Sequence, residues 1–164
     1  DKLKGSMAVG ETRITDSHIE QYIGLSKEYN TFELNDAVLK QDVGRAMRIA
    51  EHFAHNQKTY PITLTITILF GLFQQLFLLN YHMWQSRKRG IPMPADAELM
   101  RAIRANNPFA VKELKANIGR WNGPRLFKIL GYLREYDAKS KGVDSGGLDG
   151  GELLKELLLK IFMS

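Results

Sequence analysis

No cysteine occurs among the 164 residues, and this absence excludes three kinds of chemistry. A disulfide-stapled scaffold, a thiolate metal site and a cysteine nucleophile each need a side chain that the sequence lacks. His52 and His55 have a spacing that two metal ligands on one helix could use, but no third ligand follows at a recognisable offset. We therefore expect neither a metal nor any other cofactor.

Sequence signatures of phosphate binding and of catalysis are also absent. The sequence has no G-x-x-x-x-G-K-[ST] loop, no dinucleotide fingerprint, no G-x-S-x-G elbow and no H-E-x-x-H pair. No paired catalytic groups take their place. The sequence therefore predicts a chain that is not an enzyme and that has no catalytic residues.

Helical signals, in contrast, repeat along the whole chain. Thr15, Thr31 and Asp42 are candidate N-caps, and apolar residues follow each of them at helical spacings. Further helix starts are expected at Pro61, Pro94, Pro108 and Gly123-Pro124, and a last helix is expected after a Gly- and Asp-rich loop at 145–151. The pattern predicts an all-α, bundle-like domain of about six to eight helices, one of them long and central.

The long helix is expected where charge is missing, because residues 59–86 contain no Lys, Arg, Asp or Glu. Residues 62–68 alternate like a strand, but no second strand is evident. We predict instead one helix over 62–86, buried on several faces by its neighbours. The run is long enough to cross a bilayer, yet the adjacent Gln74 and Gln75 would be costly in hydrocarbon, so we expect no membrane contact.

Positive charge is in mild excess, with 23 Lys and Arg against 18 Asp and Glu. Arg87, Lys88 and Arg89 follow the apolar run directly. A basic triplet after an apolar run can be part of a solvated loop, the cytoplasmic flank of a membrane span or a phosphate contact. The solvated loop is the interpretation we adopt by default. These three residues are the candidate DNA-facing residues, although charge alone does not place a DNA-binding surface.

Several segments resemble, in order, a known protein family. Residues 23–34, IGLSKEYNTFEL, resemble the start of the C-terminal domain of the delta-subunit family of bacterial DNA polymerase III, the clamp-loader subunit. Further resemblances are Asp42-Val43-x-Arg45-Ala46, the Pro61 helix with Gln75-Leu76, Pro108-Phe109-x-Val111-Lys112, Asp137 to Gly142, and Leu153-Leu154-x-x-Leu157. The resemblance covers about residues 9–164.

The resemblance implies a domain organisation and a function. Residues 1–13 would be the tail of a preceding AAA+-like lid domain, and residues 14–164 a helical collar domain that joins clamp-loader subunits. The implied chain is a non-catalytic, cytoplasmic assembly module of the complex that loads the sliding clamp on primed DNA during replication. The parent holoenzyme is a DNA-directed DNA polymerase, whereas the delta subunit has no ATPase activity of its own.

The same resemblance implies the partners. The collar would bind the other clamp-loader subunits, delta-prime and gamma/tau. The sliding clamp would be reached only by an N-terminal domain that this sequence does not contain, and primed DNA would be held by the assembled complex. A basic helical domain that binds DNA directly is the alternative, and strong, salt-steep binding by the isolated chain would favour it.

The motif residues receive structural roles in this interpretation. Asn30 and Thr31 start a helix, Glu33 favours its dipole, and Phe32 docks it on the core. Tyr29, Asp42 and Arg45 also belong to the motif. Asp137, Lys141 and Gly142 are expected to end a helix, with Gly142 in the left-handed position after its last turn. Because interfaces favour aromatics and Met, the candidate subunit-interface residues are Met83, Trp84, Trp121, Tyr132 and Tyr136.

Overall fold

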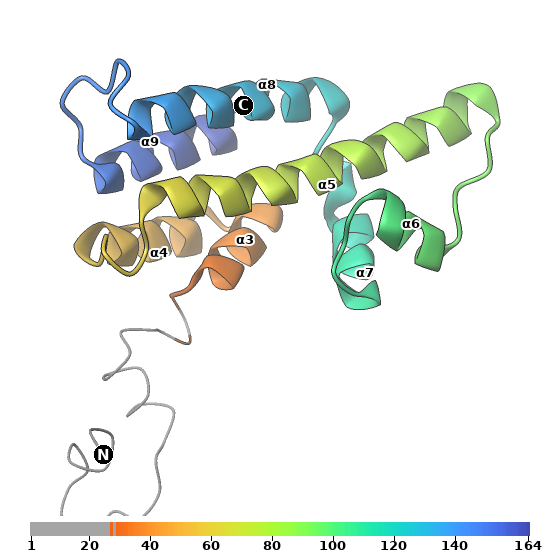
Figure 1. Cartoon of the computed structure of the whole chain (residues 1–164). Coiled ribbons are helices and arrows are strands. Elements are labelled where there is room, and N and C mark those ends of the chain that lie inside the picture. Colours follow the sequence, from red (N-terminus) through yellow and green to blue (C-terminus); the bar gives the residue numbers. More distant parts are fainter. Residues whose placement is uncertain (1–26, 28) are drawn as a thin grey trace, which may run out of the picture.

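The computed structural model describes residue 27 and residues 29–164, and every regular element among them is a helix (Figure 1). In chain order they are α3 (Thr31–Leu39), α4 (Val43–His55), α5 (Ile62–Arg89), α6 (Asp96–Ala102), α7 (Pro108–Asn117), the 3-10 helix η1 (Ile118–Arg120), α8 (Gly123–Ser140) and α9 (Gly150–Met163). The predicted all-α bundle of six to eight helices with one long helix is confirmed. The helix predicted after Thr15 and the boundary predicted between residues 13 and 14 lie outside the described residues.

Polar side chains at the helix starts explain where several of these elements begin. Asp42, Asn107 and Asn122 each accept a hydrogen bond from the backbone N–H three residues later, at 2.8–3.0 Å. Asp149 and Glu152 start α9 with a capping box, in which each side chain accepts from the other residue's backbone N–H. These bonds satisfy donors that a helix cannot satisfy internally.

The start of α3 corrects one expected cap. Asn30, not Thr31, is the N-cap, because its Oδ1 accepts from the backbone N–H groups of Phe32 and Glu33 at 3.0 Å. Thr31 is the first residue of the helix. Asn and Thr both suit this role, and the two neighbours could be told apart only by the backbone path.

α5 forms across the segment that alternates like a strand. The hydroxyls of Thr65 and Thr67 donate to the carbonyl oxygens four residues earlier, those of Pro61 and Thr63, at 3.3 and 2.9 Å. The helix extends three residues beyond its predicted end, and Gly90 terminates it with a left-handed φ of 67°. The basic triplet 87–89 therefore lies in the last helical turn, where the helix dipole favours positive charge, and not in a loop.

α5 is the axis around which the other helices are arranged (Figure 1). α8 runs antiparallel to it, and α9 packs against both α8 and α4. α3 packs against α4 and α5, while α6 and α7 pack on one another near the C-terminal half of α5. The N-terminal half of α5 thus lies inside a bundle, and its C-terminal end extends past the start of α8.

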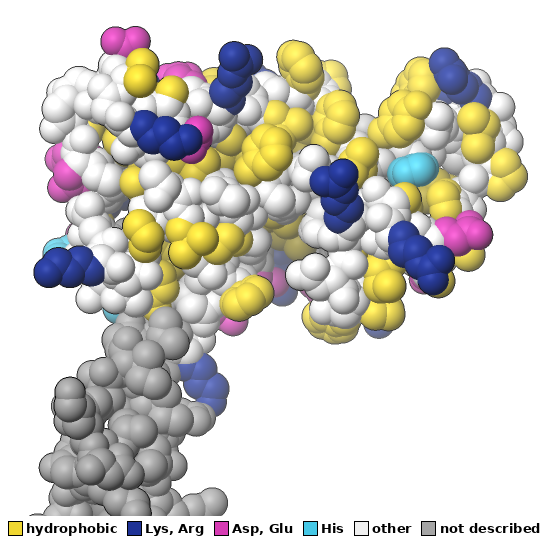
Figure 2. Space-filling model, in the orientation of Figure 1, with side chains coloured by type: hydrophobic (Ala, Val, Ile, Leu, Met, Phe, Trp, Pro, Cys, Tyr) yellow, Lys and Arg dark blue, Asp and Glu magenta, His cyan; other side chains and the backbone are white. Residues whose placement is uncertain are grey.

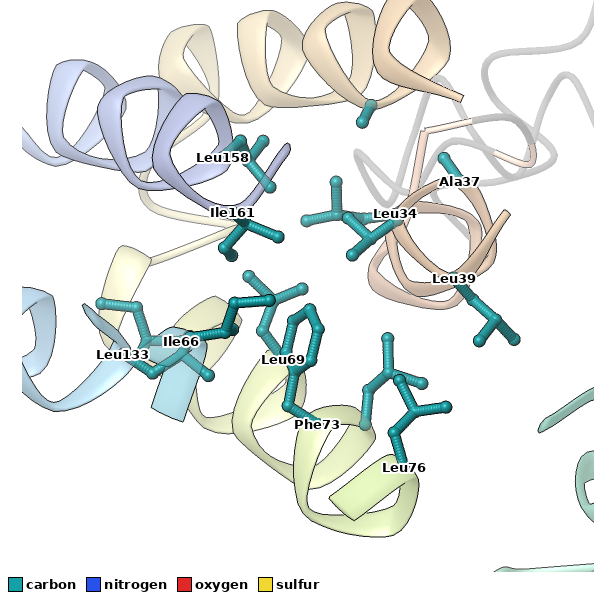
Figure 3. Close-up of a cluster of buried hydrophobic side chains, with 14 of the residues drawn as sticks. Leu34, Ala37, Leu39, Ile66, Leu69, Phe73, Leu76, Leu133, Leu158 and Ile161 are labelled. Carbon is teal, nitrogen blue, oxygen red and sulfur yellow. The ribbon is translucent and has the colours of Figure 1, made fainter. Parts of the chain in front are cut away.

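The core lies beside the N-terminal half of α5, where side chains of α3, α8 and α9 meet those of α5 (Figure 3). Leu69 and Phe73 of α5 meet Leu34 of α3, and Ile161 of α9 closes the cluster. Each of these four side chains is fully or almost fully buried. Burial of a Leu, Ile or Phe side chain stabilises a fold by roughly 1.5–3 kcal/mol, so this cluster holds α3 and α9 on α5.

Candidate interaction surfaces

α5 is buried along one face only. Its buried residues are Thr65, Ile66, Leu69, Leu72, Phe73, Leu76 and Leu79. In the most apolar 18-residue stretch of the helix, 39% of residues are buried. The prediction that its neighbours bury it on several faces is therefore wrong, because these buried residues fall on one arc of the helix. A helix that carries no charge before Arg87 is left with an uncovered side.

Four aromatic residues line the uncovered side of α5. Phe70, Phe77, Tyr81 and Trp84 are spaced seven, four and three residues apart, which places them along one line of a helix. Phe70, Tyr81 and Trp84 are between 43% and 45% exposed, and Phe77 is half-buried. We call these four residues the aromatic strip.

Phe70, at the N-terminal end of the strip, lies beside α8, which carries an exposed aromatic residue of its own. Phe127 of α8 is 73% exposed. A shallow groove of about 300 Å³ between the two helices is lined in part by Phe70, Leu133 and Asp137. Figure 2 shows hydrophobic side chains gathered over this part of the molecule. Exposed apolar side chains gathered in one region mark interaction sites more often than scattered single residues do.

α5 also has the length and composition of a membrane-spanning helix. Because the core helices of soluble proteins share these properties, they are weak evidence for a membrane span. Its polar residues are used in packing within the bundle. Gln75 Nε2 donates to the carbonyl oxygen of Arg104 at 2.9 Å, and Asn80 Nδ2 donates to that of Trp121 at 3.2 Å. These bonds attach α6 and the start of α8 to α5, and sequence reasoning did not assign them that role.

The predicted interface residues divide into two groups. Trp84 is half-exposed, and Met83 and Tyr132 are half-buried, so all three have surface to offer. Trp121 and Tyr136 are fully buried inside the domain, so the prediction that they are interface anchors is wrong. An aromatic residue with a polar handle suits a core as well as an interface when that handle finds a partner.

Both buried residues have such a partner. Trp121 Nε1 donates to the carbonyl oxygen of Leu39 at 3.1 Å, and the indole packs edge-on against Phe73. Tyr136 donates from its hydroxyl to Glu156 Oε1. Burial, together with this hydrogen bond to a carboxylate, raises the pKa of the Tyr136 phenol.

Two lysines flank the Tyr136 ring. Lys139 Nζ lies 4.6 Å and Lys160 Nζ 5.1 Å from its centroid. Both also contact Glu135, whose carboxyl pKa is lowered chiefly by the hydrogen bond from Lys139. This cluster connects α8 to α9.

The first group of motif residues meets where α3 and α4 begin. Arg45 contacts Glu33 and bonds to Asp36 at 2.8 Å, so one guanidinium joins α4 to α3. Asp42 caps the helix that carries Arg45, and the Tyr29 ring lies 5.1 Å from His52 further along α4. These contacts support structural roles for the motif.

Phe32 does not have the role expected of it. Its side chain is 79% exposed in the first turn of α3, so the prediction that it docks the helix on the core is wrong. Leu34, two residues later, is buried and takes that role. Sequence spacing places both residues near the helix start, and only the rotation of the helix distinguishes them.

The second group of motif residues ends α8. Gly142 has φ 93°, its N–H donates to the carbonyl oxygen of Lys139, and the N–H of Val143 donates to that of Ala138. This pair of bonds is the Schellman motif, and it gives Gly142 the predicted left-handed position. Lys141 Nζ bonds to Asp137 Oδ2 at 2.7 Å as an i, i+4 pair on the same helix.

The opposite end of the molecule carries most of the uncompensated positive charge. Residues 80–128 contain ten Lys or Arg and three Asp or Glu. Among the described residues, only one of these ten cations forms an ion pair, which is Lys115 with Asp96. In the rest of the described chain, six cations are paired with carboxylates, namely Lys40, Arg45, Lys139, Lys141, Lys155 and Lys160.

A groove opens at this basic end, between the C-terminal half of α5 and the start of α8. Its volume is about 320 Å³. It is lined by Asn80, Met83, Trp84, Arg87 and Lys88 of α5 and by Ile118, Gly119, Trp121, Asn122 and Gly123 of the facing segment. No carboxylate is among these lining residues. We call it the basic groove, and it brings Trp84 together with two of the three candidate DNA-facing residues.

No family model, no curated protein and no solved structure matches this chain. Among the described residues, no three His, Cys, Asp or Glu side chains are grouped so that they could hold a metal ion. The two surfaces described above are suited to binding, the aromatic strip through apolar area and the basic groove through positive charge and an indole ring.

Proposed function

We propose that this chain is a non-catalytic assembly module and, more specifically, the collar domain of a bacterial clamp-loader delta subunit. The observation that carries the proposal is the aromatic strip. An uncharged 25-residue stretch of sequence, 62–86, folds into a helix that hides one face and leaves aromatic side chains on the other. Such a face is expected when another helix bundle covers it.

The composition of this face supports a protein partner. The centres of protein interfaces are depleted of charge and enriched in Tyr, Trp, Phe and Met. The strip has three kinds of aromatic residue and no charge before Arg87. It lies on a long helix fixed by core packing, so binding costs little conformational entropy.

The resemblance of the sequence to the delta-subunit family supports the narrower identity. Its motif residues lie at helix starts, at a helix end and at the α3–α4 ion pairs, as structural motifs should. The proposed partners are the delta-prime and gamma/tau subunits, bound through this domain in the bacterial cytoplasm. Contact with the sliding clamp is assigned to an N-terminal domain, and clamp loading on primed DNA to the whole complex.

Light scattering behind size-exclusion chromatography tests the proposal. The chain is run alone and then with the matching domains of the delta-prime and gamma/tau subunits, and a heavier mixed species is expected. Phe70→Glu should abolish that species, because it places a charge in the strip. Leu159→Glu on α9, a site of equal exposure outside the strip, is the matched control and should assemble normally. Normal assembly by Phe70→Glu contradicts the role of the strip.

A basic domain that binds DNA directly is the second candidate, favoured by the unpaired cations of residues 80–128. The two functions are compatible, because an assembly module can also contact the DNA that its complex encloses. Binding to a duplex that weakens steeply with salt, without any mixed species in the chromatography, would favour DNA binding as the main function.

A further inference from the structure

The basic groove combines an aromatic ring, two cations and a polar helix start. We propose that it binds single-stranded DNA, with a base stacked on Trp84 and the adjacent phosphates held by Arg87 and Lys88. Because Trp84 also belongs to the aromatic strip, a bound strand and the protein partner of the strip would compete for this indole. The choice of DNA over RNA rests on the proposed function, because the chemistry of the groove is common to both. The choice of a single strand rests on the groove itself.

The charge of the groove calls for an anionic partner. Arg87 and Lys88 have no carboxylate within ion-pair distance among the described residues, and no acidic side chain lines the groove. The nearest helix start, that of α8, adds the positive end of its dipole at Asn122 and Gly123. A phosphodiester chain supplies the charge that this end of the protein lacks.

Trp84 distinguishes a nucleic acid from other anions. Its indole is 44% exposed at the edge of the groove. Tyr81 stacks beside it with ring centroids 6.3 Å apart, and the Arg89 guanidinium lies 5.3 Å from its centroid, so the ring is positioned before any ligand arrives. Aromatic rings beside cations are the usual platform for unpaired bases, and Arg contributes to the stacking.

The size of the groove favours a single strand over a duplex. A volume of about 320 Å³ is at the lower end of small-ligand pockets, which suits one splayed-out base with its sugar. The bases of a duplex are stacked on one another, so they cannot enter a concave site without being unpaired. A duplex could therefore contact the cations but not the indole.

Fluorescence anisotropy with a labelled oligothymidylate of about 12 nucleotides tests the proposal on the 164-residue chain. Trp84→Ala should weaken binding about five- to 150-fold, the range expected for one stacked base, and Trp84→Phe should restore most of it. Arg87→Glu with Lys88→Glu should weaken binding and lower the slope of log affinity against log salt by about 1.4. The matched control is the double variant Lys58→Glu with Arg134→Glu, which reverses the charge of two exposed cations outside the groove. This control variant should bind the oligonucleotide far more tightly than the groove variant.

Intrinsic fluorescence adds a readout that a general charge effect would not move. The chain has two tryptophans, and Trp121 is fully buried. Oligothymidylate should quench the wild-type emission but leave that of Trp84→Phe unchanged. Circular dichroism of each variant establishes that it is folded before its affinity is compared.

Four outcomes overturn the proposal. They are equal binding by the groove and control variants, no quenching of Trp84, tighter binding of the RNA oligomer of matching sequence, and equal competition by polyglutamate of the same charge. The last result would assign the groove to an acidic peptide. The chromatography keeps the two proposals separate: assembly without oligonucleotide binding removes the groove alone, and oligonucleotide binding without assembly removes the assembly function alone.

Discussion

The guanidinium of Arg125 lies 4.3 Å from the centroid of the Trp121 indole, at the corner where the start of α8 meets the end of α9. Its nitrogens donate to the carbonyl oxygens of Arg120, Ile161 and Phe162. Partial burial lowers the pKa of Arg125, although the group stays charged at neutral pH. One planar side chain thus covers the buried indole and satisfies carbonyls in the last turn of α9, which have no partner within the helix.

Loss of this side chain should destabilise the fold. We expect Arg125→Ala to lower the free energy of unfolding by about 2 kcal/mol, since several hydrogen bonds and a cation–π contact are lost together. Arg125→Lys should recover less than half of this, because an ammonium cannot reach the same carbonyls as a planar fork. Chemical denaturation measures the change. Lys128→Ala, an exposed cation one turn along α8, is the control, and a loss as large there would contradict the assignment.

A glycine sets the distance between α4 and α9. A Cβ atom built on Gly151 would lie 2.8 Å from the Cα atom of Ala54, which no side-chain rotation can relieve. We expect Gly151→Ala to destabilise the protein by about 1–3 kcal/mol, the range for overpacked cores.

The matched control is a helical glycine with open space around it. A Cβ atom on Gly71 of α5 would meet nothing within 4 Å, so Gly71→Ala should stabilise the protein by up to about 1 kcal/mol. The two alanine variants are thus expected to shift the melting temperature in opposite directions. A rise in melting temperature for both would mean that α9 moves away from α4 at little cost, and a fall for both would mean that Gly71 is also closely packed.

The helical architecture could be predicted from the sequence because its signals are local. Asp42, Pro108 and Gly123 mark helix starts, and Gly142 marks a helix end, through groups within four residues of each. The capping box of Asp149 and Glu152 has the D-x-x-E pattern and could have been found in the same way.

The candidate surfaces could not be predicted in full, because burial depends on segments far apart in the chain. Trp84 and Trp121 are the same residue type, one inside α5 and the other in the short link between η1 and α8. Trp121 is buried because the carbonyl of Leu39, 82 residues away, accepts its N–H. Trp84 stays half-exposed because α5 extends past α8. No periodicity within either segment contains that information.

The buried phenol of Tyr136 should make the free energy of unfolding depend on pH in the alkaline range. Its pKa is raised in the folded protein, so below about pH 10 the group is protonated in both states and its contribution to stability is complete. Above that pH the unfolded chain ionises first, and the free energy of unfolding falls as pH rises. Tyr136→Phe should therefore lose stability less steeply than the wild type between about pH 9 and pH 11.

Spectroscopic titration supplies an independent check of Tyr136. The tyrosinate absorbance of the folded wild type should include a most alkaline component that Tyr136→Phe lacks. Identical titration curves for the two proteins would show that this phenol ionises like the others, and that its bond to Glu156 does not favour the neutral form.

The two tryptophans should respond to truncation in opposite ways. Trp121→Ala removes a fully buried indole and should cost about 3–5 kcal/mol, as large aromatic deletions in cores do. Trp84→Ala and Tyr132→Ala remove partly exposed rings and should cost about 1 kcal/mol or less, while weakening assembly with the proposed clamp-loader partners. Thermal melting and the light-scattering assay, run on the same samples, separate the two effects. If Trp84→Ala melts like the wild type and also assembles like it, Trp84 is not an interface residue. If it unfolds as readily as Trp121→Ala, the exposed end of α5 contributes to the core through contacts that its 44% exposure does not suggest.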